Sequence, residues 1–342
     1  LNLAGSSQIK RGKTEHTSVS DESQTGRTRR GFLTATGVAA AATLAGCSGQ
    51  TDSTATEAGG DEGTPTATEA GESDETTETS GDGTLSLSIP EASNFDPVQI
   101  KGDGSQRVSD HVFSELMTLP RGDGAQLTPE AQLATDYELS EDGRTYTFSL
   151  REDATFHDGT ELTAQDVVYS WERLAASDNS QESPVILEGG FQIAHETTTE
   201  TVDGEEQEVY EPGTLQVEAV DDYTLEATLE SPFFDALFWF AYGSLSPIPE
   251  GIVGDIAGYD GEMEYAEFSS QAPVGTGLYQ INTVDTGTQV SLVATDDYHG
   301  ETTGPNRIEL QVVQNADTRY QRAAERNVDV FQLPNSRFDP SK

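Results

Sequence analysis

The strongest structural signals in the chain lie in residues 133–174, LATDYELSEDGRTYTFSLREDATFHDGTELTAQDVVYSWERL. Apolar and polar side chains alternate over residues 145–150, which predicts a strand with one apolar face. Glu141-Asp142-Gly143 before this strand and Asp158-Gly159 after it are turn sequences. The stretch therefore begins as part of an antiparallel sheet.

A helix is predicted directly after the second turn. Thr163 is a suitable N-cap, and Asp166, three residues later, can complete a capping box. Val167, Trp171 and Leu174 follow at spacings that place them on one helix face. None of these residues suggests catalysis, and we expect the helix to pack against the sheet.

The order of these elements resembles the signature region of the family 5 solute-binding proteins, the oligopeptide- and dipeptide-binding components of ABC importers. The shared phrase includes DG-x-TYTF-x-LR, FHDG and TA-x-DVVYS within residues 133–174. The FDP phrase at 95–97, the PVGTGLY phrase at 273–279 and the predicted hairpin before Pro232 also resemble the family, although Leu278 replaces its usual proline. No catalytic motif contributes to this resemblance.

The resemblance implies an α/β fold of the periplasmic-binding-protein type (type II, cluster C). We expect a mixed-sheet first lobe formed by residues 84–121 and 232–333, with a smaller α+β domain inserted at 122–231. A second large lobe would begin at 334–342 and be missing from this chain. In the family, that lobe supplies the acidic residue that holds a peptide's amino terminus.

Several elements outside the signature region are also predicted from apolar spacing. A helix carries the stripe from Val108 to Met117, and residues 175–212 are expected to be mostly irregular, with a turn at 203–204. The other predictions are strands at 85–89, 215–220, 224–229, 290–294 and 308–312, a buried helix at 233–240, a glycine turn at 275–277 that leads into strand 290–294, and a helix at 318–326.

The ligand site is placed by the resemblance in the first loop of the folded region. This loop ends in the family's FDP phrase, and its candidate ligand-binding residues are Glu91, Ser93, Asn94 and Phe95. In contrast, Phe113 and Met117 are predicted to lie in the core.

The N-terminal region predicts export and lipid anchoring. Arg29 and Arg30 lie in a twin-arginine motif, and the Ala-rich run after them is too short to span a bilayer. Cys47, the only cysteine, ends a lipobox-like sequence, so residues 1–47 are interpreted as a lipoprotein signal. Residues 48–83 lack large apolar side chains and are predicted to be a disordered linker. We expect attachment to the extracellular face of the membrane.

The charge of the chain is strongly acidic. It has 61 acidic and 18 basic residues, a formal net charge of −43. This composition suits either a protein of concentrated salt, which screens self-repulsion, or an ordinary acidic extracellular protein; we favour the halophilic interpretation. A nucleic-acid partner is disfavoured because phosphate binding requires basic patches.

No enzyme motif is found. The sequence lacks a Gly-x-Ser-x-Gly elbow, a His-Glu-x-x-His zinc motif and a P-loop. His111, His157, His195 and His299 occur singly, and His157 is expected to be structural. We therefore predict no catalytic residue, no metal site and no cofactor, although some members of the family bind nickel, haem or sugars.

The function implied by the resemblance is that of a receptor. It would capture peptides outside the cell and deliver them to an ABC permease and ATPase complex, while attached to the membrane by its lipid. The alternatives are a surface lipoprotein with a sensory or structural role, and a family member that binds nickel, haem or an oligosaccharide.

Overall fold

The computed structural model describes residues 80–100, 102–120, 128–202 and 204–332. The chain divides into two units, residues 1–72 and 73–342, and the described residues belong to the second. Arg29, Arg30 and Cys47 of the predicted export signal lie outside the described residues. Within the described ranges, no helix combines the length and apolar character needed to cross a membrane.

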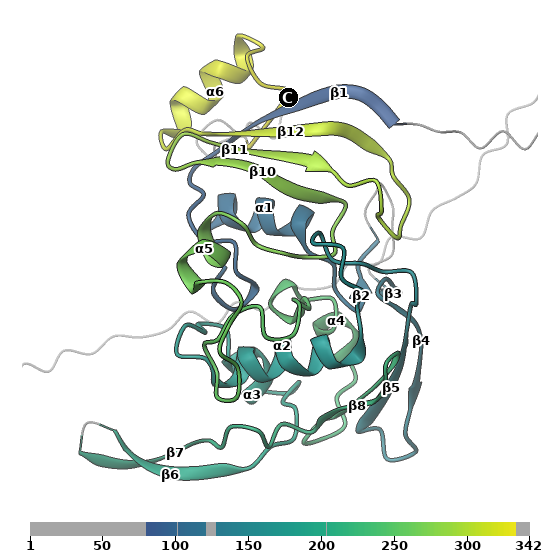
Figure 1. Ribbon diagram of the computed structural model, residues 1–342. Helices are drawn as coiled ribbons and strands as arrows, with labels where there is room; N and C mark the ends of the chain where they lie inside the picture. Colours follow the sequence, from purple (N-terminus) through teal and green to yellow (C-terminus); the bar gives the residue numbers. More distant parts are fainter. Residues whose placement is uncertain (1–79, 101, 121–127, 203, 333–342) are drawn as a thin grey trace, which may run out of the picture. The chain divides into compact units, whose positions relative to one another are not determined.

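Five strands form the larger sheet (Figure 1). They are β1 (Ser80–Ile89), β10 (Tyr279–Asp285), β11 (Gln289–Ala294), β12 (Gly304–Val312) and β13 (Val330–Phe331). The order is β10-β11-β12-β1-β13. The sheet is mixed, because β1 runs parallel to both of its neighbours, whereas β11 runs antiparallel to β10 and to β12.

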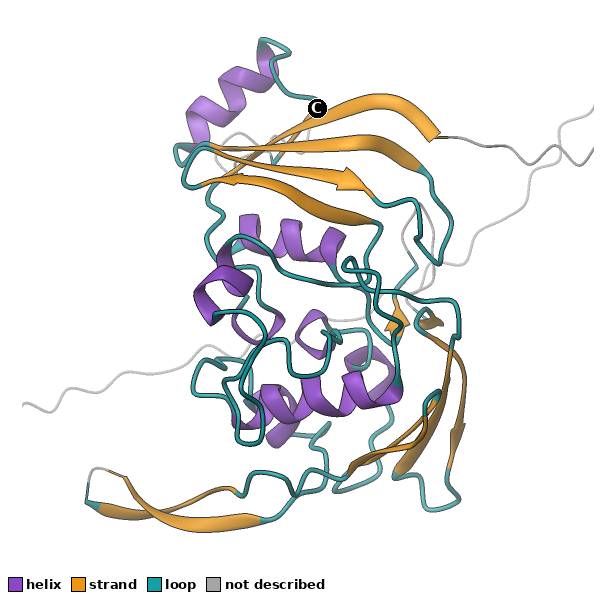
Figure 2. Cartoon of the chain, in the orientation of Figure 1, coloured by secondary structure: helices purple, strands orange, loops and turns teal. Residues whose placement is uncertain are grey.

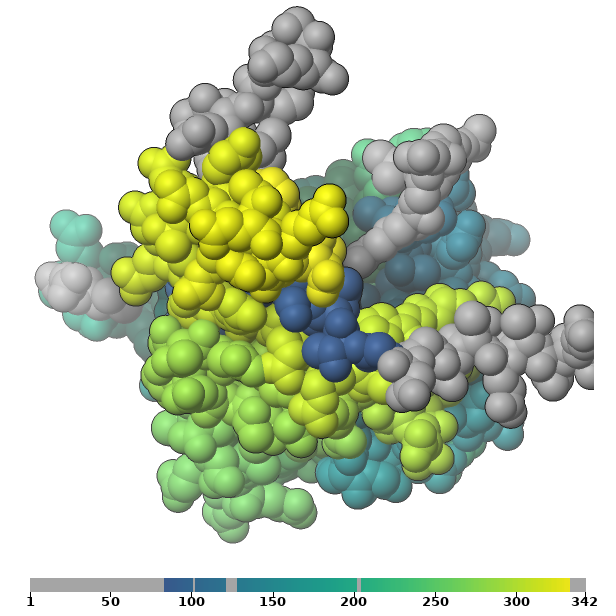
Figure 3. Space-filling view, turned by 90° about the horizontal axis from the view of Figure 1, so that it is seen from above, coloured from purple at the N-terminus to yellow at the C-terminus, as the bar shows by residue number. Residues whose placement is uncertain are grey.

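Strand β1 begins earlier than the sequence predicts. Folded structure is expected from Thr84, but Ser80 already pairs with Gly304. Backbone pairing does not require apolar side chains, so this polar start carries no alternating signal. The predicted apolar face is confirmed farther along, where Leu87 and Ile89 are buried. Seen from above, β1 (blue) is bordered by C-terminal segments (yellow) (Figure 3).

The apolar face of this sheet packs on two helices, α1 (Asp103–Val112) and α5 (Tyr265–Ser270). Val108 of α1 and Phe268 of α5 have no exposed surface, and both belong to the same buried cluster as Leu310 of β12. Removal of apolar side chains from water is the main favourable contribution to folding. This cluster is the core of the larger sheet.

Helix α1 is shorter than predicted. The apolar stripe predicts a helix through Met117, but the backbone becomes extended at Phe113 (φ −115°, ψ 156°). The Gly277 N–H donates to the carbonyl of the last helical residue at 2.9 Å, so a distant loop satisfies this end of the helix. Met117 is buried as predicted, but it lies in strand β2 (Met117–Thr118), which pairs with β3 (Glu130–Ala131).

A second, antiparallel sheet is formed largely by the signature region. Its order is β4-β5-β9-β8, with β4 (Ala134–Leu139), β5 (Thr145–Leu150), β8 (Val217–Asp221) and β9 (Thr224–Thr228). Helix α2 (Ala164–Ala176) packs against it. Strands β5, β8 and β9 confirm the strands predicted at 145–150, 215–220 and 224–229 to within one or two residues at each end.

The start of α2 also confirms its predicted cap. The Thr163 N–H and the Thr163 hydroxyl each donate to the Asp166 carboxylate at 2.7 Å. Val167, Trp171 and Leu174 are fully buried, as their spacing predicts. Local sequence alone therefore determines where this helix begins and which face it buries.

The aromatic run at 233–240 does not form the predicted buried helix. Only one helical turn is present, α4 (Ala236–Trp239), followed by the 3₁₀ turn η2 (Gly243–Leu245). Phe234 is 98% exposed, whereas Phe240 is fully buried. The prediction rested on the density of aromatic residues, not on a periodic apolar face.

Residues after 232 contribute to the core of the smaller sheet. Ala236, Phe240 and Leu245 belong to the same buried cluster as Trp171. The Trp171 indole N–H donates to the Leu245 carbonyl at 2.9 Å. The predicted domain boundary at 231/232 stays a prediction.

The segment 175–212 is more regular than predicted. It contains the hairpin β6 (Thr197–Val202) and β7 (Glu205–Tyr210), drawn as a separate two-stranded ribbon in Figure 2. Gly204 lies at its tip with φ 86°, where the sequence predicts a turn. Thr and Glu dominate both strands, so neither face is apolar, and periodicity could not reveal them.

The glycine turn at 275–277 also differs from its prediction. It leads directly into β10, not into the strand predicted at 290–294, which is β11. An added Cβ at Gly275 would lie 2.3 Å from the Val112 carbonyl oxygen, so close backbone approach explains the absence of a side chain there. The last described helix, α6 (Ala316–Ala324), lies close to its prediction.

Candidate functional site

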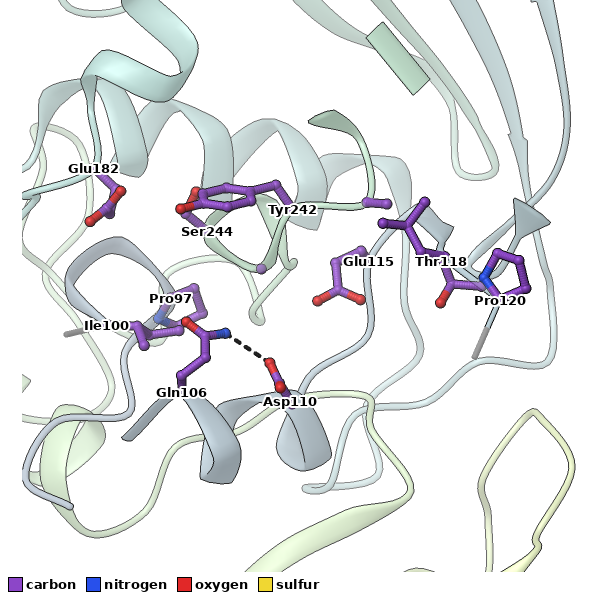
Figure 4. Close-up of a pocket in the computed structure, with 13 residues that line it drawn as sticks. Pro97, Ile100, Gln106, Asp110, Glu115, Thr118, Pro120, Glu182, Tyr242 and Ser244 are labelled. Carbon is purple, nitrogen blue, oxygen red and sulfur yellow. Dashed lines mark hydrogen bonds between the residues drawn. The ribbon is translucent and has the colours of Figure 1, made fainter. Parts of the chain in front are cut away.

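A cavity of about 360 Å³ lies where α1 meets the segments 115–120 and 241–244 (Figure 4). Pro97, which begins the 3₁₀ turn η1 (Pro97–Gln99), and Ile100 complete its wall. The volume is at the lower end of the ~300–1,000 Å³ typical of ligand pockets. It suits a small solute or one part of a larger one.

The polar lining of the cavity is acidic. Asp110 of α1, Glu115 and Glu182 contribute three carboxylates, and no described lining residue is Lys or Arg. The Gln106 side-chain amide donates to Asp110 at 2.8 Å, which orients that carboxylate at the rim of the cavity (Figure 4). Charge within the cavity therefore favours a cation.

Tyr242 adds an aromatic surface. Its side chain is 45% exposed, and its ring centroid lies 5.8 Å from that of Trp239. Burial raises the pKa of the Tyr242 hydroxyl, and the negative charge of Glu182 raises it further. The hydroxyl is therefore a proton-bearing donor at neutral pH, close to a carboxylate.

Ser244 has an unsatisfied polar atom in the wall. The residue is 6% exposed, and its Oγ has no hydrogen-bond partner among the described residues. A buried hydroxyl without a partner costs about 1–3 kcal/mol. Beside it, an added Cβ at Gly243 would lie 3.5 Å from Gln106 Nε2 and 3.7 Å from Glu115 Oε1, so Gly243 keeps this part of the cavity open.

Two of the predicted ligand-binding residues, Glu91 and Phe95, make contacts within the fold. The Gly104 N–H donates to Glu91 Oε1 at 3.3 Å, so this carboxylate lies at the N-terminus of α1, where negative charge is stabilising. Phe95 is fully buried in the core of the larger sheet, and its N–H donates to the Ser269 carbonyl at 2.7 Å. The Phe95 side chain thus has no exposed surface to offer a ligand in this structure.

The other two predicted residues are more accessible. Ser93 is exposed, and its N–H donates to Ser105 Oγ at 3.2 Å. Asn94 is half-buried, and its amide donates to Gln99 at 2.5 Å. None of the four predicted residues is among the described residues that line the cavity. Their roles as ligand contacts stay predictions.

A buried ion triplet holds the end of this loop. Arg173 of α2 donates to both oxygens of Asp96 at 2.8 and 2.6 Å and to both oxygens of Asp255 at 2.7 and 2.9 Å. The Arg173 and Asp96 side chains are 1% and 0% exposed. Bidentate pairing on both sides of one guanidinium makes the triplet strong and directional. It joins the predicted ligand loop to α2.

The outer carboxylate of the triplet is supported by further donors. Ser177 and Asn179 donate to Asp255 at 2.6 and 3.1 Å. Burial alone would raise the pKa of Asp255, but hydrogen bonds and the charge of Arg173 outweigh it and lower the pKa below its ordinary value. The carboxylate therefore stays ionised at neutral pH.

His157 has the structural role expected of it. Its Nε2 lies 2.8 Å from the Gly277 carbonyl, and the Gly275 N–H donates to its Nδ1 at 3.4 Å. A neutral ring with the proton on Nε2 satisfies both contacts. Burial lowers the pKa of His157, which favours this neutral form.

His299 has a different environment. Both ring nitrogens are buried without a hydrogen-bond partner among the described residues, and its carbonyl accepts from Arg151 at 2.6 Å. Burial, together with the nearby positive charge of Arg151, lowers the pKa of His299 to about 4. Within the described ranges, no group of three or more His, Cys, Asp or Glu is arranged to hold a metal ion.

Comparison with known proteins gives the family. The family model described as bacterial extracellular solute-binding proteins, family 5 Middle, matches residues 128–341, more than half of the chain. The chain belongs to this family. Its members are solute-binding receptors rather than enzymes.

Two curated relatives illustrate the match within the family. The periplasmic oligopeptide-binding protein OppA of Salmonella typhimurium is 33% identical over 164 residues, which cover 48% of this chain and 28% of OppA. Heme-binding protein A of Haemophilus influenzae is 27% identical over 244 residues, 69% of this chain and 41% of that protein. The chain thus spans less than half the length of these two relatives.

A solved structure shows the same fold. The Haemophilus influenzae OppA complex with RPPGFSPFR superposes with a TM-score of 0.60 at 22% identity and covers 75% of this chain and 47% of that one. The predicted α/β fold of the type II periplasmic-binding-protein class is confirmed.

Proposed function

We propose that this chain forms part of the solute-binding receptor of an ABC importer, which captures peptides outside the cell and delivers them to a membrane permease and its ATPase. The observation that supports this proposal is membership of family 5, since relatives in this family are named as peptide-binding proteins. The described cavity gives the peptide a first contact surface on this chain.

A receptor of this kind needs recognition but no covalent chemistry. A peptide would be selected by hydrogen bonds and by pockets for its side chains, and closure around it would follow from tighter binding to the closed state. The cavity meets these needs with carboxylates, a phenol and a hydroxyl on a partly apolar wall.

Peptide binding is tested by thermal unfolding and isothermal titration of the full chain with a mixture of tripeptides. A ligand at 100 times its Kd should raise the free energy of unfolding by about 2.7 kcal/mol. Gly243→Val should weaken binding, because its side chain would occupy the cavity beside Gln106. Gly83→Val, whose added Cβ meets nothing within 4 Å and whose backbone does not have a positive φ, is the control. Stabilisation by haem or nickel, with no effect of any peptide, would contradict the peptide assignment.

The proposal includes a lipid anchor at Cys47 and export through the twin-arginine route, supported by Arg29, Arg30 and the lipobox-like sequence. Cys47→Ser should release the protein from the membrane fraction, whereas Ser48→Ala should not. Replacing both arginines by lysine should stop export. A Cys47→Ser variant that still sediments fully with membranes would contradict the anchor.

A further inference from the structure

We infer that Glu91 is a positioning residue, which holds the loop 91–96 on the first turn of α1 and acts on the solute only through this loop. This inference rests on the proposed function, and it replaces the contact role predicted for Glu91 with an indirect one. Two glycines, Gly102 at the N-cap of α1 and Gly104 in its first turn, leave the space that Glu91 occupies.

The side chain of Glu91 completes the N-terminus of α1. The N-cap of this helix is Gly102, which has no side chain that could accept a hydrogen bond from the first turn. Glu91 supplies the acceptor instead, because the Gly104 N–H donates to its Oε1 at 3.3 Å. A helix begins with N–H groups that have no partner within the helix, and negative charge is stabilising there. The carboxylate therefore has a fixed place in the fold.

The backbone of Glu91 also lies directly on α1. A Cβ added at Gly104 would lie 1.6 Å from the Glu91 carbonyl oxygen, and one added at Gly102 would lie 2.1 Å from Glu91 Oε1. A backbone carbonyl cannot move aside as the end of a flexible side chain can. Gly104 does not have a positive φ, so space and not backbone conformation requires a glycine there. The loop keeps its place on α1 only while residue 104 has no side chain.

Two serines of α1 hold the loop beyond Glu91. Ser105 Oγ accepts from the Ser93 N–H at 3.2 Å, and Ser109 Oγ donates to the Phe95 carbonyl at 3.2 Å. The loop is thus attached to the helix at alternate residues. Because these attachments follow one another along α1, a displacement of Glu91 also displaces Ser93.

Ser93 is the part of the loop that a solute can reach. It alone is exposed among residues 91–96, all of which the structure describes, and Asn94 beside it is half-buried. Groups that bind a ligand have to be held within about 0.5 Å of their productive positions. Glu91 therefore determines where these two side chains meet a solute, although its own carboxylate contacts the helix.

A carboxylate that contacts the solute and one that positions a loop differ in what a substitution removes. Glu91→Gln deletes the charge but keeps an oxygen that can accept from Gly104, whereas Glu91→Ala deletes both. Charge governs a direct contact with a cationic solute, and salt weakens that attraction. The position of the loop depends instead on the acceptor oxygen and on the free space at Gly104.

Isothermal titration of the full chain with trialanine and with a tripeptide mixture, in dilute and in molar salt, measures the affinity. We expect Glu91→Gln to bind within about twofold of the parent with the same salt dependence, and Glu91→Ala to bind about tenfold more weakly. Gly104→Ala should also bind about tenfold more weakly, because its methyl group displaces the Glu91 carbonyl. Alanine is a better helix former than glycine, so α1 itself is not weakened.

Urea unfolding of the same variants separates positioning from stability. A residue with a purely structural role changes the unfolding midpoint but not the affinity of the folded chain. Glu218→Gln, at an exposed position of β8, changes the net charge as Glu91→Gln does, and Gly83→Ala adds a Cβ with nothing within 4 Å. Both controls should bind peptides as the parent does.

Weaker binding by Glu91→Ala and Gly104→Ala, in folded chains with nearly the parental midpoint, supports the positioning role. Equal losses in Glu91→Gln and Glu91→Ala, together with a smaller salt dependence than that of the parent, would mean that Glu91 contacts the solute and would overturn the inference. Undiminished binding by Gly104→Ala would overturn it as well.

Amide hydrogen exchange tests the attachment of the loop without any solute. The Ser93 N–H should exchange faster in Gly104→Ala and Glu91→Ala than in the parent and Glu91→Gln, because its bond to Ser105 depends on the position of the loop. If no tripeptide binds the parent but exchange follows this pattern, the peptide assignment is wrong and Glu91 still holds the loop. Unchanged exchange in all variants overturns the inference, whichever solute binds.

Discussion

Arg173→Met should strongly destabilise the fold. Arg173 is the only cation of the ion triplet, and its removal leaves Asp96, whose side chain is 0% exposed, as a buried carboxylate without its charged partner. Breaking a buried ion pair by removing one partner costs about 3–5 kcal/mol. Domains of this kind have total stabilities of about 5–15 kcal/mol, so the variant should lose a large fraction of its stability.

Urea unfolding followed by tryptophan fluorescence measures this loss, and Trp171 reports directly because it lies two residues from Arg173 in the buried face of α2. Arg307→Met is the matched control. Arg307 is 40% exposed and lies 3.7 Å from Glu309, so its loss should cost about 1 kcal/mol or less.

Adding Asp96→Asn to Arg173→Met tests the mechanism. If the cost comes from an uncompensated charge, neutralising Asp96 should recover part of the stability, and the two changes should be strongly non-additive. A loss in Arg173→Met no greater than that in Arg307→Met, or strict additivity with Asp96→Asn, would refute the reasoning.

Three other measurements test separate features of the chain. The pKa of His299 in the folded state is about 4, below its usual 6.5, so the unfolded state takes up the proton first as pH falls. The free energy of unfolding should therefore drop by up to ~3 kcal/mol between pH 6.5 and 4. His299→Gln should flatten this part of the pH profile. Gly277→Ala would place a Cβ 2.4 Å from the His111 carbonyl oxygen and should cost about 1–3 kcal/mol, whereas Gly83→Ala, with nothing within 4 Å, should cost little. With a net charge of −43, the urea midpoint should rise between dilute and molar salt; a constant midpoint would contradict the halophilic interpretation.

Local signals predicted the elements that depend on neighbouring residues. The capping box at Thr163 and the alternation in β5 act within a few residues, and both are present as predicted. The hairpin β6–β7 cannot be predicted from periodicity because its Thr and Glu side chains lie on both faces without an apolar period. The prediction of a buried helix around Phe234 is wrong because aromatic content alone does not ensure burial, and Phe234 is 98% exposed.

The cavity cannot be predicted from sequence patterns. Asp110, Glu182 and Tyr242 are far apart in the chain and belong to no common motif, and each alone resembles an ordinary surface residue. The only local hint was Gly243-Ser244 after an aromatic run, which no rule of spacing connects with α1. The family resemblance pointed instead to residues 91–95, beside the cavity wall at Pro97.

The pairing of β1 with β12 has a consequence for the order in which the protein can form during synthesis. Leu87 lies opposite Leu310, 223 residues later, and none of the strands described between β1 and β10 belongs to the larger sheet. At about 5–20 residues per second, a ribosome needs roughly 10–45 seconds to reach β12 after making β1. Throughout that interval β1 has no partner, whereas the smaller sheet, whose last strand is β9, is complete before β12 is made. Such a chain gains its large sheet only after β12 has been made, and a route that carries folded proteins across the membrane would accommodate that delay.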